Sequence, residues 1–299
     1  MSDAPTLLQG ATLPPCLRDL PEPPTRAFVH GELPRGPAVA IVGTRHPTEP
    51  SLEYASALAR ELCGHGVAIV SGGAEGIDTA AHRGALAGGG PTVVVAPSSF
   101  DQPFPKENAA LYREVVAEGG AYISKFERDV RATQAQFFER NSWLVALSAL
   151  VIVVELPWRS GAANAAKWAR RLGRPVLVVL HPPWNDRGTG CIEQLRLGAR
   201  PLGSVKDVMS CLEELNQHPL GRGLAAQRAP SSWRRSLPAD TTPLEHRIYA
   251  AVLDGAVSAD DVVEVTRDSA AEVNQGVLMM ILKGLIAQDG AGTLSVIDT

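Results

Sequence analysis

Six short runs of apolar, mostly β-branched residues recur between positions 37 and 215, separated by stretches in which apolar residues follow helical spacing. Each run is apolar at nearly every position, which is typical of strands that are covered on both faces of a parallel sheet. This alternation predicts repeated βαβ units, and therefore an α/β, extended Rossmann-like, doubly wound and mostly parallel sheet. The runs are Val39–Val42, Val67–Val70, Thr92–Val95, Ala121–Ile123, Leu150–Val154 and Val176–Leu180.

The pattern changes after position 215. Residues 216–240 hold three Pro, two Gly and four Arg without apolar periodicity, which predicts a linker. Two capping boxes follow, Ser258 with Asp261 and Ser269 with Glu272, and each predicts a helix start. Three helices and a hairpin with an Asp289-Gly290 turn fit into 241–299 and predict a winged-helix-like domain. We therefore divide the chain into a lead-in (1–35), a Rossmann-like domain (36–215), a linker (216–240) and a winged-helix-like domain (241–299).

Composition narrows the class of protein. Of the 299 residues, 45% are hydrophobic and 20% charged, which excludes fibrous and disordered chains. The four cysteines lie far apart without a C-x-x-C pair, so we expect buried thiols in a reducing compartment. The N-terminal residues do not resemble a signal peptide and no long apolar run occurs, so we expect a cytoplasmic protein with no membrane partner.

Charge is unevenly distributed along the chain. The net charge is -4 overall, but residues 241–299 contain three basic and nine acidic side chains. The remaining 240 residues are therefore net positive. An acidic domain is repelled by phosphates, so we expect the C-terminal domain to bind protein or to cover a DNA groove, and not to bind DNA itself.

Candidate binding residues follow the first two strands of the predicted sheet, where open parallel sheets bind ligands. Arg45 comes after the first strand and offers a planar cation, although exposed arginines are often paired with an ordinary acid. The glycine-rich turn Ser71-Gly72-Gly73, with Gly76, opens the helix after the second strand. Its backbone N–H groups and the helix dipole suit an anion. Asp78 is as suited to capping this helix as to touching a ligand, and His82 is more typical of a packing residue.

A third group of candidates lies between the fourth and fifth strands. Lys125 is followed by Phe137, Arg140 and Asn141, and cations with an aromatic between them suit the phosphates and bases of a single strand. The alternative is a solvated arginine face on a helix. In either case we expect one of Phe137 and Phe138 to be buried. Ser160-Gly161 is a second candidate anion nest.

Taken together, these residues resemble the DNA-processing protein A family, also called DprA or Smf, from about Leu13 to Ala199. The motifs that carry the resemblance are Val42-Gly43-Thr44-Arg45, Ser71-Gly72-Gly73-Ala74-Glu75-Gly76-Ile77-Asp78, Phe104-Pro105 with Asn108, and Phe137 to Asn141. The resemblance implies single-stranded DNA binding without catalysis, usually as a homodimer, and loading of the recombinase RecA in natural transformation and recombination. It also implies a C-terminal winged helix. Carried over to this sequence, Arg45, Ser71, Gly72, Gly73, Phe137, Arg140 and Asn141 would line the DNA pocket.

The chain departs from the family pattern at several polar positions. Lys125 replaces a carboxylate and would raise phosphate affinity, while Ser142 replaces an arginine. His181-Pro182 stands where the family has Pro-Gly. A divergent paralogue with an altered ligand is therefore a second hypothesis, and a sensor of a nucleotide-derived ligand on the same fold is a third.

An enzyme is disfavoured. We find no nucleophile next to a base and no cluster of His, Cys or carboxylates with metal spacing, so we expect no cofactor and no metal. The second motif that related hydrolases need is absent after Gly161, and a dinucleotide fingerprint is also missing.

Overall fold

A computed structural model describes residues 4–18, 20–157, 161–182, 184–217, 241–253, 256, 258–266, 268–288 and 294–296. The chain divides into two compact units, Met1–Ala229 and Pro230–Thr299.

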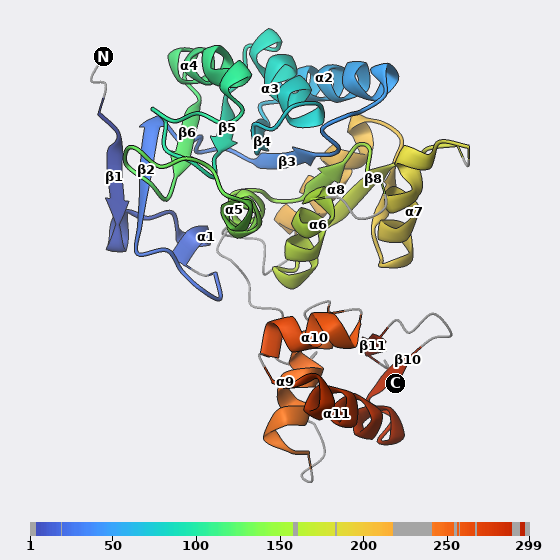
Figure 1. Cartoon of the computed structure of the whole chain (residues 1–299). Coiled ribbons are helices and arrows are strands. Elements are labelled where there is room, and N and C mark those ends of the chain that lie inside the picture. The colour runs from blue at the N-terminus through green and yellow to red at the C-terminus, as the bar shows by residue number, and fades with distance from the viewer. Residues whose placement is uncertain are drawn as a thin grey trace. The chain divides into compact units, whose positions relative to one another are not determined.

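The described part of the first unit is built on one nine-stranded sheet in the order β1-β2-β6-β5-β4-β3-β7-β8-β9 (Figure 1). Neighbouring strands are parallel from β6 to β9, whereas β2 is antiparallel to β6 and to β1. The predicted α/β, mostly parallel fold is therefore confirmed. The strands are β1 (Thr6–Gln9), β2 (Arg26–Gly31), β3 (Ala38–Val42), β4 (Ala68–Ser71), β5 (Thr92–Val95), β6 (Ala121–Ser124), β7 (Val151–Val153), β8 (Val176–Val179) and β9 (Arg200–Leu202).

The six predicted strands are present, but three further strands were missed. The segment expected only as a lead-in contributes β1 and β2, and β2 pairs directly with β6 through Phe28 and Ser124. The sequence of this segment has no continuous apolar run that would predict the two strands. The reason is that β1 is mostly exposed and β2 is exposed at both ends, so polar residues are tolerated there. The three-residue β9 is exposed at two positions, so it has no apolar signal either.

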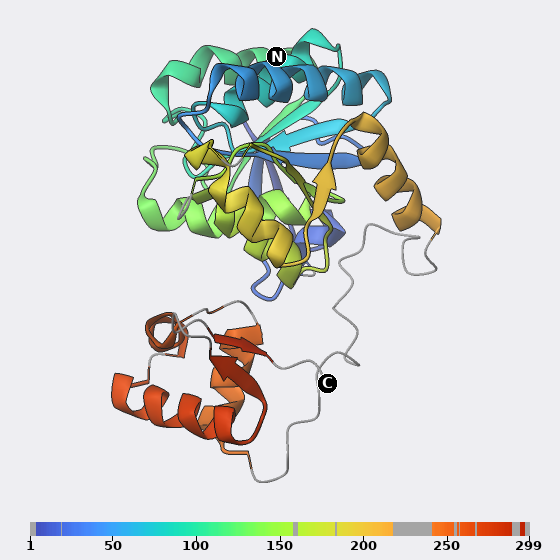
Figure 2. The same ribbon diagram turned by 90° about the vertical axis from the view of Figure 1, so that its right-hand side faces the viewer.

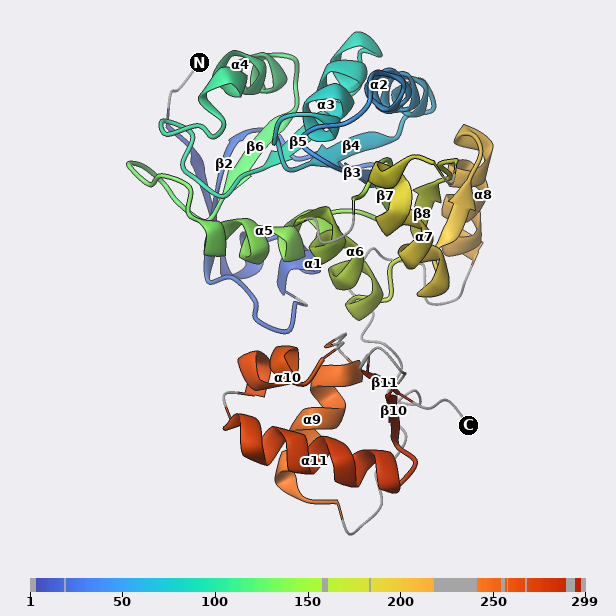
Figure 3. The same cartoon turned by 45° about the vertical axis from the view of Figure 1, so that its right-hand side comes forward.

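Helices cover both faces of the sheet, as Figures 1 and 2 show. One face is packed by α2 (Glu49–Gly64), α3 (Ile77–Ala87), α4 (Ala109–Ala117) and α8 (Val205–Gln217). The other is packed by α1 (Pro15–Arg18), α5 (Gln134–Ala146), α6 (Gly161–Arg171) and α7 (Thr189–Arg196), with α5 and α6 side by side in Figure 3. Short 3₁₀ turns lie at Gly10–Thr12, Lys106–Asn108 and Asp186–Gly188.

Alanines allow α6 to approach the sheet closely. Ala165, Ala166 and Ala169 are each at most 1% exposed and belong to the same apolar core as the strands. Cys63, Cys191 and Cys211 are buried thiols, as expected, whereas Cys16 is partly exposed.

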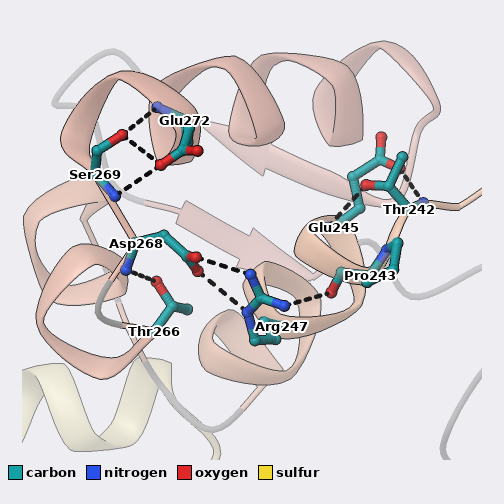
Figure 4. A network of polar contacts seen from close by, with 8 residues as sticks. All are labelled: Thr242, Pro243, Glu245, Arg247, Thr266, Asp268, Ser269 and Glu272. Atoms are coloured by element: carbon teal, nitrogen blue, oxygen red, sulfur yellow. Dashed lines mark hydrogen bonds and ion pairs between the residues drawn. The ribbon is translucent and has the colours of Figure 1, made fainter.

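The second unit contains α9 (Pro243–Leu253), α10 (Ala259–Thr266), α11 (Ala270–Leu282) and the antiparallel pair β10 (Ile286–Gln288) and β11 (Leu294–Val296). Both predicted capping boxes are confirmed: the Asp261 amide donates to Ser258 Oγ at 3.1 Å, and the Glu272 amide donates to Ser269 Oγ at 3.3 Å. Figure 4 shows the second box beside the Arg247–Asp268 ion pair.

These helices and strands are the elements of a winged helix, and that assignment stays a prediction. The expected hairpin turn at Asp289-Gly290, most of the linker and Ser160 lie outside the described residues. In the parts of the chain that the structure describes, none of the helices has the length and apolar character needed to cross a membrane.

Candidate nucleic-acid interface

The loop that carries Arg45 is fixed to the start of α3. The amide of Ile77 donates to the Thr44 carbonyl at 3.3 Å, and the Thr44 amide donates to the Glu155 carbonyl at 2.8 Å. Gly76 adopts a φ of +78°, and a Cβ there would lie 2.5 Å from the Thr44 oxygen. Gly76 therefore permits both the left-handed backbone and the close approach of the two segments.

Arg45 lies against a pair of aromatic rings. Its guanidinium is 5.0 Å from the centroid of the Phe137 ring, a cation–π distance, and Phe104 meets the same ring edge-on at 5.3 Å. Among the described residues, no carboxylate lies within ion-pair distance of Arg45. The arrangement leaves an exposed cation and a partly exposed aromatic side by side at the carboxyl edge of the sheet.

The expectation that Phe137 or Phe138 would be buried was wrong. Phe137 is partly exposed and Phe138 is 45% exposed. Both lie in the first half of α5, whereas the buried residues of α5 start at Arg140. The apolar character of these two rings is therefore used at the surface and not in the core.

The glycine-rich bend is filled by the protein's own side chains. A Cβ at Gly72 would clash with the guanidinium of Arg140, and the Gly73 carbonyl accepts hydrogen bonds from the Tyr112 hydroxyl at 2.6 Å and the Asn108 amide at 2.9 Å. Ser71 is buried, and its hydroxyl donates to the Ile41 carbonyl at 2.6 Å. The bend is therefore not the open cradle that the sequence predicts.

The N-terminus of α3 already has an anion of its own. The Ala74 amide donates to the Asp78 carboxylate at 3.3 Å, and Asp78 is 6% exposed. Burial raises the pKa of Asp78, and the nearby Arg140 and the Ala74 amide oppose that rise. Asp78 thus occupies the position at the start of α3 that the sequence offers to an anion.

Arg140 is a buried cation with an unsatisfied donor. It is 9% exposed, and its Nε has no hydrogen-bond partner in the structure. Burial lowers the pKa of Arg140, with Asp78 acting in the opposite direction. A buried donor without a partner is costly, so the Nε of Arg140 is a hydrogen-bond donor that the folded chain leaves unused.

His82 is a packing residue, as the sequence suggests. It is fully buried on α3, and its Nδ1 lies 2.8 Å from the Thr92 hydroxyl. That hydroxyl donates to the Ile69 carbonyl, so Nδ1 carries the proton and Nε2 is left without a partner. Burial lowers the pKa of His82 to about 3, which keeps the ring neutral.

The two remaining candidates, Lys125 and Asn141, are both engaged in contacts with other side chains. Lys125 follows β6 and forms an ion pair with Glu139 of α5, with both side chains about half exposed. Asn141 is 9% exposed and donates to the Asn164 side chain at 3.0 Å, which joins α5 to α6. The structure therefore brings together Arg45, Gly72, Gly76, Phe137 and Arg140. Lys125 is paired with Glu139, and Asn141 takes part in the contact between α5 and α6.

Sequence reasoning did not identify two participants. Phe104 was noted only as part of a motif, and its contact with Phe137 depends on a fold that brings the segment after β5 to α5. Glu155 is fully buried and accepts from the Thr48 hydroxyl at 2.7 Å, which holds the start of α2 beside the Arg45 loop. In the sequence, Glu155 is a carboxylate directly after a continuous apolar strand, and this pattern could have identified it as a candidate.

Comparison with known proteins identifies the family. The model of the family described as DNA recombination-mediator protein A matches residues 6–213. The putative DNA processing protein DprA of Mycobacterium tuberculosis is 39% identical over 180 residues, which is 60% of this chain and 46% of that protein. The match thus covers about half the length of that relative. DprA of Bacillus subtilis is 31% identical over 203 residues, 67% of this chain and 68% of that protein.

Two solved structures support the same grouping. DNA processing protein A from Helicobacter pylori, described with a unique single-stranded DNA binding mode, is 30% identical with a TM-score of 0.62, covering 70% of this chain and 96% of that one. DprA from Streptococcus pneumoniae is 28% identical with a TM-score of 0.64, covering 70% and 74%. On the strength of the family match and these relatives, the chain belongs to the DNA recombination-mediator protein A family.

Proposed function

We propose that this chain binds single-stranded DNA at the carboxyl edge of its sheet and does so without catalysis. The observation that carries the proposal is the contact of Arg45 with Phe137 next to the buried, unsatisfied guanidinium of Arg140. In such an arrangement the cation can bind a phosphate while the ring stacks on a base. Proteins that bind single-stranded nucleic acid combine these two contacts.

The proposed site residues act in two ways. Arg45, Phe137 and Lys125 have solvent-accessible side chains and would touch the strand directly, while the buried guanidinium of Arg140 adds positive charge next to the Phe137 ring. Ser71, Gly72, Gly73, Gly76 and Asn141 belong to the same interface, and their present contacts shape the bend and the helix junction that hold these groups.

The family membership supports a wider role for the protein. We propose that it assists recombinase loading, with RecA as the partner, during DNA uptake or recombination, and that it acts as a cytoplasmic homodimer. The relative from Helicobacter pylori, whose single-stranded DNA binding is described, supports the choice of ligand.

A salt titration tests the ligand. The full chain is titrated with fluorescent oligo-dT, with the same sequence as a duplex, and with a panel of mononucleotides. We expect tight binding of the single strand, with an affinity that falls as salt rises in proportion to the phosphates contacted. Saturable binding of a mononucleotide with no preference for the strand would instead support a nucleotide sensor and would overturn the proposal.

A further inference from the structure

The turn that follows β8 presents a tryptophan to solvent. Trp184 is 83% exposed, which is the largest exposed fraction among the large hydrophobic side chains that the structure describes. Exposed apolar residues are common on proteins, but a large aromatic side chain held outside the core is typical of a binding surface.

Residues before and after Trp184 form hydrogen bonds. His181 Nε2 lies 2.6 Å from the Val154 carbonyl and therefore donates to it, which leaves Nδ1 to accept from the Asn185 side chain at 3.1 Å. The Asn185 amide donates to the Pro182 carbonyl at 2.9 Å and closes the turn. The residues on either side of Trp184 are therefore tied to the sheet and to each other, which limits the positions that the ring can take before it binds a ligand.

The same turn is connected to the loop of the proposed DNA site. Arg187 Nη1 donates to the His46 carbonyl, next to Arg45. In the sheet, β8 is separated from β3 only by β7, so the carboxyl ends of β3 and β8 lie about 10 Å apart at the usual strand spacing. Trp184 and Arg45 therefore belong to one edge of the sheet.

We infer that Trp184 is a second base-stacking platform for the same unpaired strand, in addition to Phe137. The inference rests on the proposed function. The spacing of about 10 Å between the two strand ends corresponds to roughly three nucleotides at the duplex rise of about 3.4 Å, and to fewer in an extended strand, so a strand of several nucleotides can pass both ends. Asp186, two residues after Trp184, is exposed, and Arg187 is engaged with the His46 carbonyl, so this turn contributes stacking and no added phosphate neutralisation.

The sequence alone does not indicate that the turn around Trp184 stacks on a base. The turn lies where the chain departs from the family pattern, at His181-Pro182. The histidine is the residue that anchors the turn to Val154, so the departure and the tryptophan platform are structurally connected.

The test measures binding of the full chain to oligo-dT of increasing length by fluorescence anisotropy. Trp184→Ala is expected to weaken binding of a long oligonucleotide roughly 5- to 150-fold, the effect of one lost base stack. Binding of a dinucleotide, whose two bases lie closer together than the two strand ends, should stay unchanged. The salt dependence should also stay unchanged, since no phosphate contact is removed. Trp184→Phe should restore most of the affinity.

Leu197→Ala is the matched control, because Leu197 is another exposed apolar residue, 43% accessible, at the end of α7. It should leave binding unchanged. If Arg45→Ala and Phe137→Ala weaken binding while Trp184→Ala does not, the inference is wrong and the proposed function stands. If the wild-type chain fails to bind single strands, both are wrong. A change of oligomeric state in Trp184→Ala with unchanged DNA affinity would show a protein contact instead, and would also overturn the inference.

Discussion

The guanidinium of Arg140 occupies the space in which a side chain at position 72 would lie. Gly72, in the glycine-rich turn, therefore makes room for a buried arginine of α5, in addition to shaping the backbone. The Arg140 guanidinium also lies 6.0 Å from the centroid of the Phe137 ring. Arg140 therefore contacts both the glycine-rich turn and the aromatic ring of the proposed site.

Gly72→Ala should destabilise the first unit by about 1–3 kcal/mol, because the added methyl group overpacks the site. In an Arg140→Ala background the same substitution should cost less than about 0.5 kcal/mol, since the clashing group is gone. Urea unfolding of the four proteins measures this coupling. Equal costs in both backgrounds would show that Arg140 does not fill the bend.

Gly76→Ala should displace the Arg45 loop as well as strain the backbone. Gly89 is the matched control: it also has a positive φ, +65°, but a Cβ there would meet nothing within 4 Å. We expect Gly89→Ala to cost about 1–2 kcal/mol from backbone strain alone, and Gly76→Ala to cost more and to weaken DNA binding. Unfolding and binding measurements on both variants check this, and similar results for the two would contradict the proposed close approach to Thr44.

His82 should make the stability of the first unit depend on pH. Its pKa is about 3 in the folded protein against 6.5 for an unperturbed histidine, so the unfolded state binds the proton first. The stabilisation is complete above pH 6.5 and is lost as the pH falls toward 3. Between about pH 7.5 and about pH 5.5 this loss should reach about 1.4 kcal/mol.

His82→Gln should lack that contribution to the pH dependence. The raised pKa of Asp78 acts in the opposite sense, but it is present in both proteins, so their difference isolates the histidine. Urea unfolding at several pH values provides the measurement. Parallel curves for wild type and variant would mean that His82 titrates normally in the folded state.

Glu139→Gln should increase affinity for single-stranded DNA by a few-fold. Glu139 forms an ion pair with Lys125, and its removal leaves the ammonium group available for a phosphate and raises the salt dependence by up to about one contact. Stability should change by less than about 1 kcal/mol, because the pair is exposed. In a Lys125→Ala background the same change should have little effect on binding, and a loss of affinity in Glu139→Gln would rule out this competition.

The sequence predicts the sheet well because its central strands are buried on both faces and so are continuously apolar. Such runs mark Val39–Val42 and Val176–Leu180 directly. It does not predict β2, whose place depends on pairing with the distant β6. The site is predictable in its residues but not in its contacts: the sequence identifies Gly72 and Arg140, while their contact arises only when α5 packs on the sheet.

Lys125 illustrates the same limit. The sequence shows a cation where the family has a carboxylate, and charge alone suggests an added phosphate contact. The pairing with Glu139 depends on how α5 lies beside the end of β6, which no local pattern specifies. Phe137 and Phe138 were expected to divide between core and surface, because apolar residues are counted as core unless the position of the helix relative to the sheet edge is known.

The salt dependence of oligo-dT binding by Arg45→Ala tests the central claim most directly. Arg60, an exposed arginine on α2, provides the control in Arg60→Ala. The account predicts that Arg45→Ala lowers the affinity and reduces the slope of log K against log salt by about 0.7, one phosphate contact of a single strand, while Arg60→Ala changes neither. An unchanged affinity and slope in Arg45→Ala would contradict the placement of the DNA at this edge of the sheet.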